Sequence, residues 1–214
     1  VLAGCADYAR IMLLVMGFIS LFVTAVFVYH INNYKRMLAY SSIENMGILA
    51  IGTALGGVGM LAAMIHLIGH SLIKASFFLT SGNILELSVT GIMKHDRKTG
   101  WLWVASFLGI AAFPPSVLFI SEFLMVKTMF LKEHYVLCAL FLLLLTIILF
   151  GLGKAVIKMA FSSGKNEHSA EAENKKLSWT MYAPQIIMLI LAFVIGIYMP
   201  QGLIKMIIFA VKGF

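Results

Sequence analysis

The chain has 214 residues, of which 61% are hydrophobic and only 12% are charged. A soluble domain carries about 25% charged residues. No fold surrounded by water hides this much apolar surface, so a soluble globular protein is excluded and the lipid bilayer is the expected solvent. The net charge of +7 does not indicate nucleic acid as a partner, because excess basic residues commonly flank the spans of membrane proteins on the cytoplasmic side.

About six membrane-spanning segments are predicted, since each needs roughly 20 apolar residues. They cover residues 10–31, 37–54, 60–87, 101–131, 135–161 and 181–199. The fourth is long and contains Pro114 and Pro115, which lack a backbone donor and clash with the preceding turn, so we expect this helix to be broken near mid-membrane. The predicted fold is an all-α polytopic membrane helix bundle, a single membrane domain over residues 1–214.

The segments between the spans predict the orientation. Residues 161–180 are expected to form a polar cytoplasmic loop, and residues 201–214 a tail at the membrane interface that is too short to span. Basic residues are more frequent in the turns after spans one, three and five, which places those turns in the cytoplasm and both ends of the segment outside. Because the chain begins with Val1, we expect it to be a piece of a longer protein or a processed one.

The third span contains three ionisable residues on one predicted helix face. His66, His70 and Lys74 have the spacing i, i+4, i+8 and extend over roughly 12 Å. Ionisable groups inside a membrane are costly and by default indicate a functional path. Histidine titrates near neutral pH, and a desolvated lysine can take up and release a proton. These residues are therefore candidate members of a proton relay.

Other roles for these three residues stay open. The two histidines could hydrogen-bond between helices, and Lys74 could extend its ammonium group to the interface. A histidine pair at i, i+4 is also a known metal-ligand pair, although no third ligand is evident nearby in the sequence.

Three further ionisable residues lie within the predicted spans. Glu122 follows the double proline and has apolar flanks. A broken helix frees backbone carbonyls and admits water, which makes an intramembrane carboxylate tolerable, so Glu122 joins the candidate relay, with an ion pair to another span as the alternative. Glu44 and Lys154 are possible relay members or surface residues near the cytoplasmic ends of their spans.

The sequence contains no glycine-rich phosphate loop, no cysteine cluster and no nucleophile with a paired base. We therefore expect no cofactor and no electron chemistry in this chain.

Three segments resemble the antiporter-like subunits of respiratory complex I, membrane-bound hydrogenases and multisubunit sodium/proton antiporters. They are residues 34–47, residues 65–85 with the pattern His-x-x-x-Lys, and Pro114-Pro115 followed by Ser121-Glu122-Phe123. The pattern Ser-x-Glu-Asn-x-Gly is most similar to the hydrogenase-4 and formate hydrogenlyase type, whereas the quinone-reducing type commonly has histidine at Asn45.

The resemblance implies that Lys74 is the central relay lysine, His70 its neighbour on the path and Glu122 the terminal acidic site. It also implies a prokaryotic cytoplasmic membrane, partner membrane subunits, and peripheral redox subunits that carry iron–sulfur clusters and NiFe or flavin. A full member has an N-terminal half that is absent here, so this segment is not expected to pump alone.

The expected function is proton translocation driven by electron transfer in partner subunits. Alternatives are a sodium/proton antiporter subunit without redox partners and a structural membrane anchor for a peripheral oxidoreductase. A solute transporter is less favoured, because no substrate-pocket signature is present.

Overall fold

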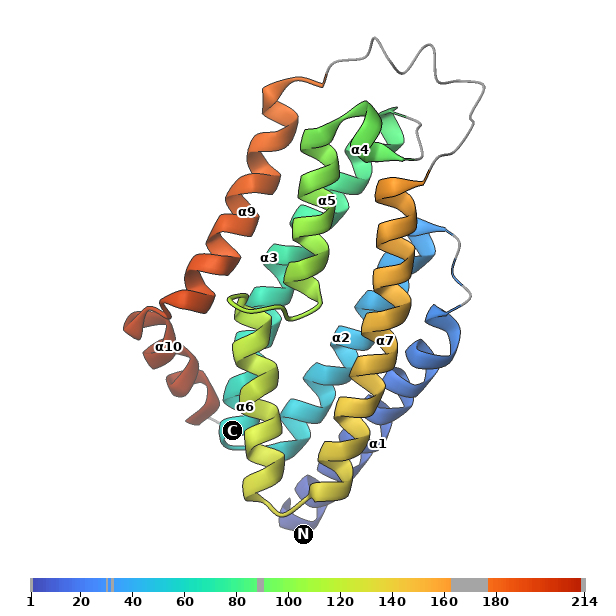
Figure 1. Ribbon diagram of the computed structural model, residues 1–214. Coiled ribbons are helices and arrows are strands. Elements are labelled where there is room, and N and C mark those ends of the chain that lie inside the picture. The colour runs from blue at the N-terminus through green and yellow to red at the C-terminus, as the bar shows by residue number, and fades with distance from the viewer. Residues whose placement is uncertain (1, 30, 32, 88–90, 163–176, 213–214) are drawn as a thin grey trace.

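The computed structural model describes residues 2–29, 31, 33–87, 91–162 and 177–212. Regular structure in this part of the chain is entirely helical (Figure 1). The helices are α1 (Leu2–Val28), α2 (Tyr34–Leu55), α3 (Val58–Leu87), α4 (Ile92–His95), α5 (Arg97–Ile110), α6 (Val117–Leu131), α7 (Tyr135–Phe161), α9 (Trp179–Ile197) and α10 (Gln201–Lys212). The prediction of an all-α fold is confirmed.

Four of the described helices are long and apolar enough to cross a membrane. They are Ala6–Val28 in α1, Val58–Leu87, Tyr135–Phe161 and Trp179–Ile197. The protein is therefore polytopic. The other two predicted spans do not reach this standard among the described residues: α2 includes the polar run 40–45, and the long fourth segment is divided into α5 and α6, of 14 and 15 residues.

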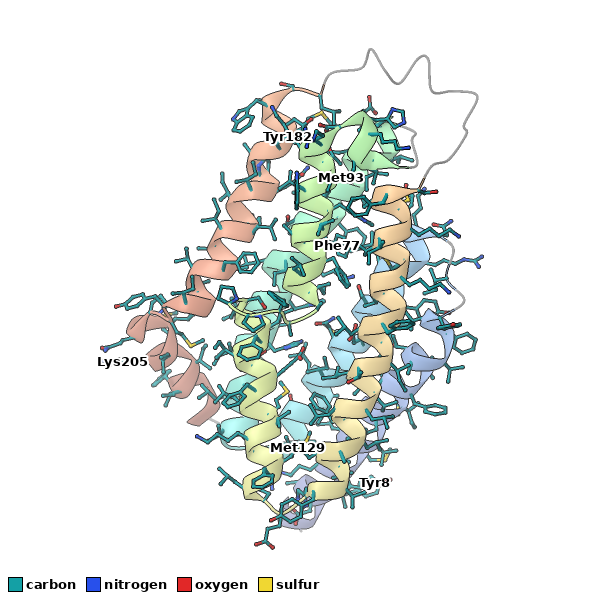
Figure 2. All side chains as sticks on the ribbon, viewed as in Figure 1. Tyr8, Phe77, Met93, Met129, Tyr182 and Lys205 are labelled. Carbon is teal, nitrogen blue, oxygen red and sulfur yellow. The ribbon has the colours of Figure 1, made fainter. Side chains whose placement is uncertain are left out.

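Helix α3 lies in the middle of the bundle and packs against α2, α5, α6 and α9. The C-terminal ends of α3 and α7 lie at one end of the bundle, and the N-terminus lies at the other (Figure 1). Fully buried side chains such as Leu21, Ile73, Trp103 and Phe141 fill the interior. Phe77 of α3 points into this interior (Figure 2), and its ring packs 4.5 Å from that of Trp103.

The predicted helix break lies between α5 and α6. Helix α5 ends at Ile110 and α6 begins at Val117, and the peptide bond between Pro114 and Pro115 is cis. Ser116 starts the second half, because its hydroxyl accepts a hydrogen bond from the Phe119 amide at 3.3 Å and so caps the helix.

Two neighbouring helices approach this break through glycines. A methyl group at Gly69 of α3 would collide with the side chain of Val117, and one at Gly196 of α9 would collide with the Pro115 carbonyl oxygen. The backbone of the break is therefore enclosed by close helix–helix contacts on both sides.

The C-terminal segment forms α10 after Pro200. Its Ile207 is buried and the helix contacts α3, whereas Met206 and Phe209 are exposed, and Lys205 points away from the bundle (Figure 2). The interfacial position of residues 201–214 stays a prediction. Of the predicted loop 161–180, residues 163–176 lie outside the described part of the chain, and α9 already begins at Trp179.

Candidate functional site

The three ionisable residues of α3 lie in the protein interior. His66, His70 and Lys74 are 0%, 7% and 6% exposed. The two imidazole rings are nearly parallel, with centroids 6.3 Å apart, as their spacing along one helix face predicted. Lys74 does not extend to the surface. The sequence pattern therefore located a buried ladder of three titratable groups.

The ammonium group of Lys74 is held by helix α2. Its Nζ donates to the Leu38 carbonyl oxygen and to the Ser41 hydroxyl, each at 2.5 Å. The same nitrogen lies 5.2 Å from the centre of the Phe78 ring. These partners are neutral, so the hydrogen bonds compensate partly for desolvation without an opposite charge in direct contact.

The imidazole of His66 connects three helices. Its Nε2 lies 3.0 Å from the Asn45 Oδ1 of α2, and its Nδ1 lies 2.9 Å from the Ser121 Oγ of α6. The Asn45 amide nitrogen donates to the Ser41 carbonyl at 2.7 Å, so its oxygen faces the histidine. A carbonyl oxygen only accepts, which assigns the proton of neutral His66 to Nε2.

The hydroxyl of Ser121 suits either charge state of His66. In the neutral state it donates to the unprotonated Nδ1. When Nδ1 carries a proton, Ser121 accepts it as a hydrogen bond and turns its own proton to the Leu118 carbonyl, which lies 2.7 Å from Oγ. His66 can therefore gain or lose a proton while both hydrogen bonds of its ring are kept, because the Ser121 hydroxyl rotates between Nδ1 and the Leu118 carbonyl oxygen.

Glu44 and Glu122 line one cavity beside the helix break. It has a volume of about 190 Å³ and is bordered by the end of α5 and by α7. Glu44 is 7% exposed, and its Oε2 has no hydrogen-bond partner among the described residues. The Glu44 side chain is therefore not exposed on the surface of the bundle. Its carboxylate interacts electrostatically with both Lys74 and Glu122.

Lys154 lies apart from these residues. It is exposed, with Nζ 4.5 Å from the centre of the Tyr29 ring, and it borders a separate apolar groove between α5 and α7. The structure does not join it to the α3 ladder.

The sequence analysis missed Ser41, Asn45 and Ser121 as partners of the ladder. Ser41 and Asn45 lie in the motif that contains Glu44, and Ser121 precedes Glu122. Ser41 and Asn45 have the i, i+4 spacing of one helix face, and this spacing could have identified these two residues.

A second polar cluster was also missed. Gln185 of α9 accepts hydrogen bonds from Thr80 at 3.1 Å and Asn83 at 3.4 Å, and Ser76 donates to its backbone carbonyl at 3.1 Å. Lone serine, threonine and asparagine residues in an apolar helix carry no sequence signal for this pairing. The cluster attaches α9 to α3.

The metal alternative has no support in the described part of the chain, where no three histidine, cysteine or acidic side chains are grouped as ligands. The arrangement instead combines proton-carrying groups: two imidazoles, an ammonium group and two carboxylates, with hydroxyl and amide groups between them. It defines a membrane protein with titratable groups in its interior.

The family model for the transmembrane part of NADH:quinone oxidoreductase and Mrp antiporter proteins matches residues 2–149. The chain belongs to this family of antiporter-like membrane proteins. The relationship expected from its three sequence motifs is confirmed.

Among curated relatives, the hydrogenase-4 component F homolog of Methylacidiphilum infernorum is 29% identical over 202 residues, which cover 91% of this chain and 41% of the relative. A Na⁺/H⁺ antiporter subunit of Alkalihalophilus pseudofirmus is 27% identical over 172 residues, or 77% of this chain and 34% of the relative. The chain thus spans less than half the length of these relatives.

The fold is also that of a chain in the membrane-bound sulfane sulfur reductase, an archaeal respiratory membrane complex. The TM-score is 0.80 at 20% identity, covering 95% of this chain and 42% of that chain.

Proposed function

We propose that this chain conducts protons through the membrane as part of a multisubunit redox-driven complex. The observation that carries the proposal is the series of buried groups His66, His70, Lys74 and Glu44. The half-buried Glu122 shares a cavity with Glu44 at the helix break. Such groups are expensive inside a membrane and usually lie on ion pathways.

The proposed path has two parts. Along α3, protons move between His66, His70 and Lys74, with the Ser121 hydroxyl completing the hydrogen bonds of His66 in either charge state. From Lys74 the path continues to Glu44 and then to Glu122, which share a cavity large enough for several water molecules. Charge changes in neighbouring subunits would shift the proton affinity of Lys74 and drive loading and release.

We infer six spans for this function, with α2 as the second and the pair α5–α6 as a discontinuous fourth. Helix α2 supplies Ser41, Glu44 and Asn45 to the interior, which accounts for its lower hydropathy. The basic end of the bundle, with Lys35, Arg36, Lys94, Arg97 and Lys98, is assigned to the cytoplasm by the positive-inside rule.

The names of relatives support two related functions. Hydrogenase-4 and sulfane sulfur reductase favour a redox-driven complex. We propose peripheral redox subunits with iron–sulfur clusters and NiFe or flavin, as the family resemblance implies. The antiporter relative favours exchange of sodium for protons without a redox partner. Because Glu44-Asn45 stands in the hydrogenase-4-like motif, we place the redox-driven function first, in a prokaryotic cytoplasmic membrane.

The deciding experiment uses the complete complex in sealed native membrane vesicles. Lys74→Ala is compared with Lys127→Ala, which removes an exposed lysine of α6. We expect Lys74→Ala to abolish acidification driven by the electron donor while the complex still assembles, and Lys127→Ala to acidify normally. Normal pumping by Lys74→Ala would contradict the relay. Sodium-dependent proton exchange without any electron donor would establish the antiporter function instead.

A further inference from the structure

The cavity beside the helix break has the chemistry of a cation site. Two carboxylates face it, Glu44 from α2 and Glu122 from α6. The Glu44 carboxylate is buried and its Oε2 has no partner among the described residues. A buried carboxylate oxygen without a donor is costly and calls for a bound proton, cation or water.

Backbone oxygens add to this negative character. In a continuous helix the carbonyls of Ile110 and Ala111 would accept from residues 114 and 115, but both of these are proline and have no N–H. Ile110 and Ala111 border the cavity. They also lie at the C-terminal end of α5, where the helix dipole is negative and favours a cation. Ends of broken helices coordinate ions in other membrane proteins for the same reason.

The remaining border of the cavity is neutral. Helix α7 contributes Thr146, whose hydroxyl oxygen is a possible ligand, and otherwise leucines. The positive group nearest in the network is the Lys74 ammonium, which is in electrostatic contact with Glu44 but is held by Leu38 and Ser41. On α3, His66 and His70 are further buried titratable groups, whereas Lys127 of α6 and Lys154 of α7 are exposed. Two carboxylates in one enclosed space do not both stay ionised without a cation between them.

We propose that Glu44 and Glu122, with the freed carbonyl oxygens at the end of α5, form a single binding site for one monovalent cation, either a hydrated proton or Na⁺. Both occupants need the same oxygen-rich, negatively charged surroundings. The inference deepens the proposed function, on which it rests for the transport of the ion, and it makes Glu44 a binding residue equal to Glu122.

The test uses the purified complex in sodium-free potassium buffer and infrared difference spectra of the carboxyl groups. One series adds NaCl at fixed pH, and the other varies pH without sodium. Glu44→Gln removes one carboxylate with little change of shape, and Glu133→Gln removes an exposed one in the turn between α6 and α7 as a control. Size-exclusion chromatography checks that each variant assembles.

A Na⁺ site predicts that adding NaCl changes the carboxylate bands and that this change saturates with NaCl concentration. The change should be lost in Glu44→Gln and kept in Glu133→Gln. A proton site predicts no sodium response, but a Glu122 titration that moves by about one pH unit or more in Glu44→Gln, a tenfold change in proton affinity. If the titration and the sodium response of Glu122 are the same with and without Glu44, the shared site is wrong.

If Glu44→Gln fails to assemble, Glu122→Gln provides the reciprocal measurement. The sodium response or the titration of Glu44 must then differ between Glu122→Gln and the wild type. Glu44 bands that are the same in both would overturn the proposal. These spectra are recorded without electron transfer or pumping, so they test ion binding by Glu44 and Glu122 independently of proton transport along the relay. Coupled carboxylates together with normal pumping by Lys74→Ala would leave the site intact and reject the proposed function.

Discussion

The imidazole of His66 is fixed from both sides, with its Nε2 3.0 Å from Asn45 Oδ1 and its Nδ1 2.9 Å from Ser121 Oγ. The histidine is completely buried, so both contacts are protected from water. Helices α2 and α6 therefore determine the tautomer and the orientation of a side chain that belongs to α3.

Ser121→Ala removes the partner of His66 Nδ1 and leaves a buried polar atom unsatisfied. We expect a loss of about 1–3 kcal/mol in the free energy of unfolding and a slower rate of proton translocation at normal assembly. Thermal unfolding in detergent and vesicle acidification measure the two effects. Ser71→Ala, on the exposed side of the same α3 helix, serves as control. Equal behaviour of the two variants would contradict the role of Ser121.

Gly196→Ala tests the enclosure of the helix break. The added methyl group collides with the Pro115 carbonyl oxygen, so α9 must move away, and overpacking of this kind costs about 1–3 kcal/mol. We expect a lower unfolding temperature and reduced translocation. Gly82→Ala is the matched control, because a methyl group there meets nothing within 4 Å. A wild-type unfolding temperature for Gly196→Ala would show that the contact is not tight.

Gln185→Leu tests the polar attachment of α9 to α3. The change leaves the Thr80 hydroxyl without its contact to the glutamine side chain and the Asn83 amide without an acceptor. We expect about 1–3 kcal/mol of destabilisation and easier proteolysis near α9, measured by limited digestion in detergent. Thr180→Ala, an exposed site on the same helix, should digest as the wild type does. An undiminished resistance of Gln185→Leu would place the stability of α9 in its apolar contacts.

Asp96 lies at the end of the bundle opposite the N-terminus, and its hydrogen bonds predict that the free energy of unfolding depends on pH. Burial opposes ionisation of its carboxyl group, but hydrogen bonds from the Thr99 and Tyr182 hydroxyls and the Lys98 and Thr99 amides outweigh burial and hold the pKa of Asp96 below its usual 3.8. Since the pKa is lower in the folded state, the stabilisation is complete above about pH 4 and is lost as pH falls through the folded-state value.

Asp96→Asn removes this charge from the N-terminus of α5. We expect about 0.3–1 kcal/mol of destabilisation at neutral pH, because asparagine still caps the helix but its charge is lost, and a smaller drop in unfolding temperature between neutral and acidic pH than in the wild type. Asp7→Asn, whose carboxylate is exposed beside Arg10, is the control. An unchanged acid profile for Asp96→Asn would contradict the assigned cause.

Local patterns predicted the elements that depend on one stretch of chain. The i, i+4 spacing of His66, His70 and Lys74 located their shared face, because helix geometry alone fixes it. Pro114 and Pro115 located the break, because proline cannot continue the hydrogen-bond ladder.

Contacts between helices were beyond the sequence analysis. Glu44 looked like a surface candidate because its depth was judged along α2 alone, whereas packing of α2 against α3 and α7 buries it. Ser121 and Gln185 likewise gained their partners from segments far away in the chain. Buried polar residues of α2, such as Ser41 and Asn45, lower its mean hydropathy, and α2 is not among the four candidate spans.

The ladder on α3 runs along the bundle, so a proton that moves along the proposed relay also crosses part of the transmembrane electric field. From His66 to Lys74 the rise is roughly 12 Å, or about two fifths of a hydrocarbon layer of about 30 Å. A full crossing changes the energy of one charge by about 2.3 kcal/mol per 100 mV. Movement along the ladder therefore changes it by about 0.9 kcal/mol at a membrane potential of about 100 mV. On the proposed path, proton binding at Lys74 is thereby coupled to the membrane potential as well as to the electron-transfer reaction.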